Sequence, residues 1–153
     1  MYKTRLATLA DVDNLVSLRL VFLEEVGSIH SGVDSGELGK AIKDYLLRKI
    51  PTGEFLAWIA ESDGRIEGTS DLTLFERPPN GANVTGREAY LSNMYTLPDW
   101  RGKGVGTALI TAIIDHVKAT SARRIWLHAT DQGKPVYEKA GFVMSKTDME
   151  LAW

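Results

Sequence analysis

Three glycines alternate with other residues at positions 102, 104 and 106, shortly after Pro98 and Arg101. Glycine has no side chain to keep a ligand away from the backbone, so several N–H groups in such a loop can converge on one anion. Apolar residues then recur at helical spacing over 105–117, which predicts a helix whose N-terminus adds partial positive charge. The segment therefore predicts a phosphate-binding loop, although an ordinary strand-to-helix turn can also require small residues.

Two well-known phosphate-binding motifs do not match this loop. A P-loop requires lysine followed by serine or threonine, whereas Lys103 is followed by Gly104. A dinucleotide fingerprint places its third glycine three residues after the second. Counted from Gly104 or Gly106, that position holds Thr107 or Leu109. The loop is therefore typical of neither class of nucleotide-binding protein.

The loop instead resembles the acetyl-CoA pyrophosphate loop of the GNAT superfamily of N-acyltransferases. That loop has arginine or glutamine, two residues, glycine, one residue, then glycine or alanine, and Arg101, Gly104 and Gly106 fit it. The preceding segment 94–98 looks like the family's fourth strand, and 136–142 looks like its short helix entering the sixth strand. The resemblance is sharp from residue 88 to 144 and only topological before that.

The resemblance implies a fold and a reaction. Residues 1–153 are expected to form a single GNAT-type domain, an α/β fold with a mixed, mostly antiparallel central sheet of six to seven strands. About four helices are expected to cover both faces of that sheet. Acetyl-CoA is the implied co-substrate, without a metal. A primary amine would attack the thioester directly and form a tetrahedral oxyanion, after which the CoA thiolate would leave.

The family's cofactor contacts can be carried over by position. Backbone groups at Met94 and Thr96 are the implied partners of the pantetheine arm, and an N–H at Met94 or its neighbour is the implied oxyanion donor. Thr130 stands where the family often carries asparagine, so that contact to the pantetheine would differ. The full implied set is Met94, Tyr95, Thr96, Arg101, Gly102, Lys103, Gly104, Val105, Gly106 and Thr107.

The catalytic groups have unequal support in the sequence. Tyr137 occupies the position at which the family commonly carries the phenol that protonates the leaving thiolate. The general base has no motif, and the candidates are Glu25 at the end of the first helix, with its neighbour Glu24, and Glu88 at the start of the fourth strand. Each of these carboxylates also fits plain surface charge, and a base can act through a water relay.

The acceptor is expected where the first two helices and the loop 27–36 meet the open end of the sheet, by analogy with the family. Negative charge at Glu24, Glu25, Asp34 and Glu37 favours a small cationic amine, and a peptide terminus stays open. The alternative function is a non-catalytic acyl-CoA-binding sensor or interaction module. The sequence does not identify the amine or the physiological acyl group.

Composition narrows the remaining function classes. The 153 residues are 44% hydrophobic and 25% charged, with a net charge of −2 and no basic run, which disfavours nucleic acid as a partner. The absence of cysteine excludes a cysteinyl intermediate, and three scattered histidines predict no metal site.

No apolar stretch reaches membrane-span length, so a cytoplasmic location is expected. Apolar residues such as Trp153 suggest a homodimer.

Hydrophobic periodicity and turn residues predict the elements that must position these groups. Asp11 and Asp34 are expected to cap the first two helices, and Ser62-Asp63-Gly64 to form a hairpin turn. Strands are expected at 3–8, 55–61, 65–75, 88–97, 124–129 and 149–153. Helices are expected after Asp11, after Asp34, after the glycine loop, and around Pro135.

Overall fold

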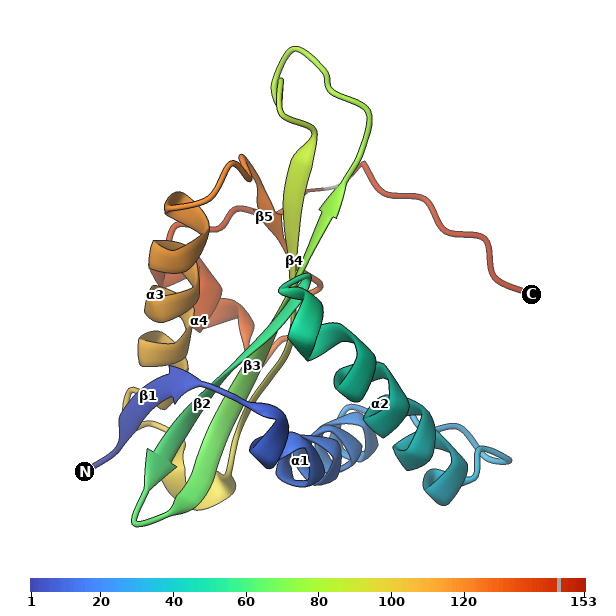
Figure 1. Ribbon diagram of the computed structural model, residues 1–153, viewed down its shortest axis with the longest axis vertical. Coiled ribbons are helices and arrows are strands. Elements are labelled where there is room, and N and C mark those ends of the chain that lie inside the picture. The colour runs from blue at the N-terminus through green and yellow to red at the C-terminus, as the bar shows by residue number, and fades with distance from the viewer. Residues whose placement is uncertain (146) are drawn as a thin grey trace.

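The computed structural model describes residues 1–145 and 147–153, which form a five-stranded mixed sheet with helices on both faces (Figure 1). The strands follow the chain order across the sheet, β1 to β4 are antiparallel, and β5 is parallel to β4. The strands are β1 (Lys3–Leu6), β2 (Phe55–Ser62), β3 (Arg65–Glu76), β4 (Arg87–Thr96) and β5 (Ile125–Trp126). The helices are α1 (Val12–Glu25), α2 (Ser35–Lys49), α3 (Val105–Lys118) and α4 (Lys134–Lys139), with 3₁₀ turns at η1 (Leu9–Asp11), η2 (Ile50–Thr52) and η3 (Pro98–Trp100).

Two hydrophobic cores lie on opposite faces of the sheet. Successive side chains of a strand point to opposite faces, and β2 shows this directly. Phe55, Ala57 and Ile59 pack under α1 and α2. Trp58 and Ala60 pack under α3 and α4. Figure 1 shows the two helix pairs on either side of the sheet, so the mixed α/β architecture with helices on both faces is confirmed.

Local turn chemistry sets the register of the central hairpin. Asp63 and Gly64 both have positive φ, at 50° and 75°, as a tight two-residue turn between β2 and β3 requires. Further along β3, Gly68 allows close packing of the sheet against α3. A Cβ atom at Gly68 would lie 2.8 Å from a Val105 methyl carbon. The first turn of α3 is therefore fixed against the middle of the sheet.

The helix starts follow the expected polar residues, with one difference in detail. Asp34 accepts the Glu37 N–H at 2.8 Å and caps α2, as expected. The cap at the start of η1 is a reciprocal pair instead. The Thr8 side chain accepts the Ala10 N–H, and the Asp11 carboxylate accepts the Thr8 N–H at 2.7 Å. Asp11 therefore stabilises the turn that leads into α1 without capping α1 itself.

The expectation of six to seven strands is wrong, because the described residues form five. The segment 149–153 has the alternation of a strand, yet it leaves the body of the protein and pairs with no strand of the described chain (Figure 1). The fifth strand is also shorter than expected, since only Ala89 and Tyr90 of β4 pair with it. Alternation specifies which side chains share a face, but a strand also needs a neighbour for its backbone groups.

Around Pro135 the expected short helix is present as α4, with the proline in its first turn. None of the helices in the described part of the chain is long and apolar enough to cross a membrane.

Candidate active site

The glycine loop is an exposed turn that delivers the chain into α3. Gly102 and Gly104 have φ of 74° and 81°, in the left-handed region where a side chain is disfavoured. Gly104 directly precedes the first residue of α3, and the backbone from 102 to 104 is exposed. The first N–H groups of a helix have no intrahelical partner and carry partial positive charge. The loop can therefore bind an anion with backbone groups.

Arg101 connects this loop to the end of α1. Its Nε donates to the Thr96 carbonyl at 3.0 Å, and its guanidinium donates to both Glu25 carboxylate oxygens at 2.7 and 2.9 Å. The guanidinium also lies 5.6 Å from the centre of the Tyr95 ring. The structure thus brings Arg101, Glu25, Tyr95 and Thr96 together at the end of β4. Glu25, a candidate base in the sequence, is an ion-pair partner of the loop arginine.

A bulge interrupts β4 immediately before these residues. Ser92 pairs with Asp71 and Tyr95 pairs with Thr69, so Asn93 and Met94 together oppose a single residue of β3. Asn93 has a φ of 52° and is 4% exposed. Such a bulge re-aims the strand and is common beside active sites.

Beyond Tyr90, the edge of β4 that faces β5 has no strand neighbour in the described chain. This free edge runs from Leu91 toward the glycine loop. It can therefore accept hydrogen bonds from an extended ligand.

Tyr137 lies on α4, on the same side of the sheet as α3. It is 7% exposed and its ring packs against Phe142 at 5.9 Å between centres. Burial raises the pKa of Tyr137 to about 12, and the nearby Tyr90 adds to this shift. The neighbouring Val136 faces the first turn of α3, where a Cβ on Gly106 would lie 3.7 Å from its methyl carbon. The phenol is therefore protonated at neutral pH, and the helix that carries it packs against the first turn of α3, which follows the glycine loop.

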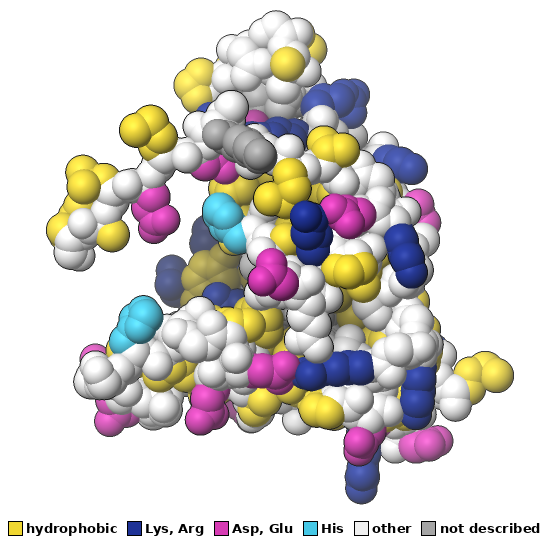
Figure 2. All heavy atoms as spheres, turned by 180° about the vertical axis from the view of Figure 1, so that it is seen from behind, with side chains coloured by type: hydrophobic (Ala, Val, Ile, Leu, Met, Phe, Trp, Pro, Cys, Tyr) yellow, Lys and Arg dark blue, Asp and Glu magenta, His cyan; other side chains and the backbone are white. Residues whose placement is uncertain are grey.

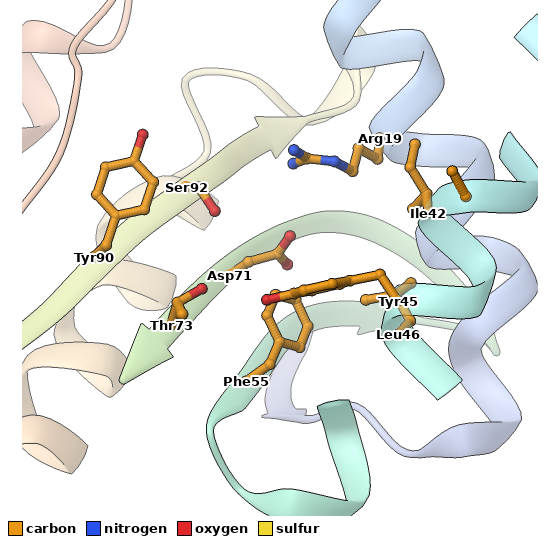
Figure 3. A pocket seen from close by; sticks show the side chains of 10 residues that line it. Arg19, Ile42, Tyr45, Leu46, Phe55, Asp71, Thr73, Tyr90 and Ser92 are labelled. Atoms are coloured by element: carbon orange, nitrogen blue, oxygen red, sulfur yellow. The ribbon is translucent and has the colours of Figure 1, made fainter. Parts of the chain in front are cut away.

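A cavity of about 410 Å³ lies on the other side of the sheet, between α1, α2 and strands β2 to β4 (Figure 3). Its walls combine apolar and polar side chains, among them Arg19, Tyr45, Phe55, Asp71, Tyr90 and Ser92. In Figure 3 the Arg19 guanidinium and the Asp71 carboxylate both extend into the space between the helices and the sheet. The view from behind shows a hollow beneath the C-terminal segment, with basic and hydrophobic side chains inside it (Figure 2).

Asp71 is the main residue that the sequence analysis missed. It is 4% exposed, and its Oδ1 has no hydrogen-bond partner in the described structure. Burial raises the pKa of Asp71 to about 7, against the opposing effect of the Arg19 charge. The available signal was a carboxylate in the middle of the strand pattern of 65–75, which also contains Glu67. A buried carboxylate in a cavity is a candidate for proton transfer.

The other predicted acidic residues lie away from this cavity. Glu88 is buried and lies near Arg77 and Arg124, at 3.3 and 3.4 Å. Its ion pairs are located at the opposite end of β4 from the glycine loop. The exposed side chains of Glu24, Asp34 and Glu37 are not among those that line the cavity.

Thr130 supports the turn before α4. Its hydroxyl accepts the Gly133 N–H at 3.1 Å, and its carbonyl accepts the Lys134 N–H at 3.0 Å. Since α4 carries Tyr137, Thr130 has a structural role in placing that helix.

In comparisons with known proteins, the family model and the similar proteins are all acetyltransferases. The family model described as the acetyltransferase (GNAT) family matches residues 23–142. A glucosamine 6-phosphate N-acetyltransferase from Trypanosoma brucei brucei is 27% identical over 88 residues, which span 58% of this chain and 58% of that protein.

Solved structures extend the likeness to nearly the whole chain. A predicted acetyltransferase from Clostridium acetobutylicum, crystallised with acetyl-CoA, has a TM-score of 0.91 and 33% identity and covers 99% of this chain and 96% of its own. A GCN5-related N-acetyltransferase from Ralstonia eutropha has a TM-score of 0.86 at 23% identity, with 100% and 99% coverage, and shares the fold.

Proposed function

The chain belongs to the acetyltransferase (GNAT) family and is an acyltransferase enzyme, and on that premise we propose that it transfers the acetyl group of acetyl-CoA to a primary amine of a small molecule. The observation that carries this proposal is the free edge of β4 leading to an exposed glycine loop at the start of α3. GNAT acetyltransferases use acetyl-CoA, and the similar Clostridium acetobutylicum structure contains it. We take residues 1–153 as one such domain.

The glycine loop would hold the pyrophosphate of acetyl-CoA. Backbone N–H groups over 102–107 would contact the phosphate oxygens, with support from the charges of Arg101 and Lys103. Arg101 already binds the Glu25 carboxylate. To contact a phosphate, its guanidinium would have to release Glu25 and bind the phosphate oxygens instead. Met94 and Thr96 would bind the pantetheine arm along the free edge of β4. Tyr95 would pack beneath it, against Phe22 of α1.

The reaction needs a donor for the oxyanion and a proton for the leaving sulfur. The neutral amine attacks the thioester carbonyl carbon, and the oxyanion is stabilised by the N–H of Met94 or its neighbour at the bulge. As the C–S bond breaks, the sulfur takes the phenolic proton of Tyr137. A phenol is a weaker acid than a thiol, and burial widens this difference by raising the pKa of Tyr137 to about 12. We therefore propose that Tyr137 takes a proton from the positively charged nitrogen as it gives its own proton to the sulfur.

The acceptor would bind in the cavity beside β3 and β4. A volume of about 410 Å³ between two helices and the sheet favours a small molecule over a peptide terminus. The sequence predicted a small cationic amine, and Asp71 supplies a carboxylate for its ammonium group. Arg19 adds a positive charge that a purely cationic molecule would meet unfavourably. A cytoplasmic location, a homodimer and the absence of nucleic acid or membrane partners stay predictions.

Calorimetry and a thiol assay together test this function. Acetyl-CoA should bind selectively over NAD and ATP, and a thiol reagent should detect free CoA once an acceptor is added. The amine panel contains matched pairs that differ in one anionic group: glucosamine 6-phosphate with glucosamine, because one relative is named for that substrate, and amino acids with their amides. Binding without thiol release for every amine would support the non-catalytic alternative, and no acetyl-CoA binding would overturn both.

A further inference from the structure

Two opposite charges face the same cavity from different elements. Arg19 reaches in from α1 and Asp71 from β3 (Figure 3). The two charged groups are more than 4.0 Å apart and do not form an ion pair with one another. Thr73 and Ser92 add hydroxyl groups beside Asp71, and Ile42 lies on the apolar wall opposite. The cavity is therefore dipolar, with one negative and one positive side chain available.

The Asp71 carboxylate is unusually placed for a residue with only a structural role. It is 4% exposed, and its Oδ1 makes no hydrogen bond in the described structure, although the Asn93 amide lies close enough to lower the pKa of Asp71 slightly. A buried charged group without a partner is costly, so such groups are retained where a ligand or a proton supplies what is missing. The Asp71 side chain is directed into the cavity, so a ligand in that cavity can approach the carboxylate and donate a hydrogen bond to it (Figure 3).

We propose that the acceptor is a zwitterion, an amine that also carries an anionic oxyacid group, with its ammonium against Asp71 and its carboxylate or phosphate against Arg19. In this arrangement Asp71 takes one proton from the ammonium, so that the neutral amine can attack. The inference rests on the proposed function and names the substrate class of that same site. It departs from the purely cationic acceptor that the surface acidic residues indicated.

The proton balance of the reaction is complete with this assignment. The ammonium loses two protons between substrate and amide. Asp71 accepts the first and later releases it to water, and the second reaches the CoA sulfur through Tyr137. Burial raises the pKa of Asp71 to about 7, nearer to that of an amine, which makes the first transfer less unfavourable. The ionisable groups that face Asp71 in the cavity are Arg19, Tyr45 and Tyr90, beside the Asn93 amide.

The matched amine pairs test the role of Arg19. The native enzyme should show at least tenfold higher kcat/KM for the anionic member of a pair than for its uncharged partner. Arg19→Gln should abolish that preference mainly through KM for the anionic member, and Arg19→Lys should restore part of it. Arg48→Gln is the matched control, because it makes the same charge change on an exposed residue of α2 outside the cavity lining. The amino acid and amide pairs test for recognition of a carboxylate, and the glucosamine 6-phosphate and glucosamine pair tests for recognition of a phosphate.

Asp71→Asn tests the proton transfer separately. This variant keeps the size of the side chain, should lower kcat at least tenfold for every amine, and should remove the rise of kcat/KM with pH near 7. Acetyl-CoA affinity and the melting temperature report that the variant is folded.

The zwitterion proposal is overturned if uncharged or purely cationic amines are the better native substrates, or if Arg19→Gln keeps the native preference. An unchanged pH profile in Asp71→Asn would overturn the proton-transfer role. In each case the native enzyme still releases thiol with some amine, so these failures differ from failure of the proposed function, in which no amine gives thiol.

Discussion

Tyr137 and Asp71 lie on opposite faces of the sheet, and burial raises the pKa of both side chains. The protonation state at neutral pH differs between them, because a phenol and a carboxyl group have different ordinary pKa values. Tyr137, with a pKa of about 12, stays protonated and can donate to a leaving sulfur. Asp71, with a pKa of about 7, exchanges a proton near neutral pH and can accept one from the substrate. The same desolvation thus leaves a phenol that donates a proton and a carboxyl group that can accept one, because their ordinary pKa values differ.

At this scale we expect Tyr137→Phe to lower kcat at least several-fold while the dissociation constant of acetyl-CoA changes less than twofold. The ring keeps its packing against Phe142, and only the hydroxyl that we propose as the proton donor to the sulfur is removed. Steady-state kinetics and calorimetry on the same preparations measure the two quantities. Equal turnover by the two proteins would remove Tyr137 from the mechanism.

At the scale of elements, the path from β4 through the glycine loop to α3 gives the proposed anion-binding loop its position. The bulge at Asn93 re-aims the strand, η3 turns the chain, and Gly104 starts the helix in a left-handed conformation. Gly68 then lets β3 approach Val105, which fixes the first turn of α3 against the sheet. The loop therefore lies between a bulged strand and a helix whose first turn packs closely on the sheet.

Gly104→Ala should weaken acetyl-CoA binding at least tenfold, because the added methyl group would lie where we propose that the cofactor approaches the backbone. Part of any effect comes from strain, since alanine in the left-handed region costs about 1 kcal/mol. Gly53→Ala is a matched control, with φ 73° and ψ 2° against 81° and 4° at Gly104, and open space around its Cβ position. Calorimetry should find acetyl-CoA affinity unchanged in the control, and equal losses in both variants would contradict the anion-binding role.

The junction of β1 and α1 is an independent element that responds to acid. Arg5 donates to both Asp11 oxygens at 2.9 and 3.0 Å, and to Glu61 of β2 at 2.7 Å. The Arg5 hydrogen bonds, followed by the Thr8 contacts, lower the pKa of Asp11 to about 2. Because the folded value lies below the unfolded value of about 3.9, Asp11 stabilises the fold above pH 4 and loses that contribution between pH 4 and 2.

Asp11→Asn should therefore lower the free energy of unfolding by about 1–2 kcal/mol at pH 7 and by much less at pH 2. Urea titrations at the two pH values measure this difference. Asp44→Asn is the control, since Asp44 forms only an exposed i,i+4 pair with Lys40 and should change stability too little to measure. If Asp11→Asn lowered the free energy of unfolding equally at both pH values, the loss would come from the capping hydrogen bonds. That result would contradict a contribution from the ion pair with Arg5.

At the scale of the whole molecule, the C-terminal segment leaves apolar side chains in solvent. Met149, Leu151 and Trp153 alternate and are at least 85% exposed, while β5 is an edge strand with one neighbour. An edge strand and an unpaired alternating segment can complete one another between two copies. The predicted homodimer would bury both.

Sedimentation equilibrium should then give twice the 16.9 kDa mass of one chain. Leu151→Asp should shift that mass to a single chain, because a charge would be buried against the partner. Val84→Asp changes another exposed apolar residue, in the loop between β3 and β4, and should leave the native mass unchanged. A native protein that sediments as a monomer would contradict the dimer.

The sequence by itself determined the features that depend on neighbouring residues in the chain. The glycine loop, the hairpin turn at Asp63, the helix around Pro135 and the helix periodicity after Gly104 are local, and each has the expected structure. The family followed from the same local motifs, because the loop and the Tyr137 segment occur in a specific order. Local geometry can be predicted since φ preferences and side-chain periodicity act within a few residues.

Only the tertiary structure decided which distant groups meet. Glu88 and Glu25 looked equivalent as bases, but arginines from other elements bind both of them. Asp71 looked like a strand residue, and its burial with Arg19 around a cavity depends on how α1 and α2 pack over β3. The strand expected at 149–153 depended on a neighbour that the described chain does not supply. Burial, ion pairing and strand pairing are set by long-range contacts, which spacing along the chain does not encode.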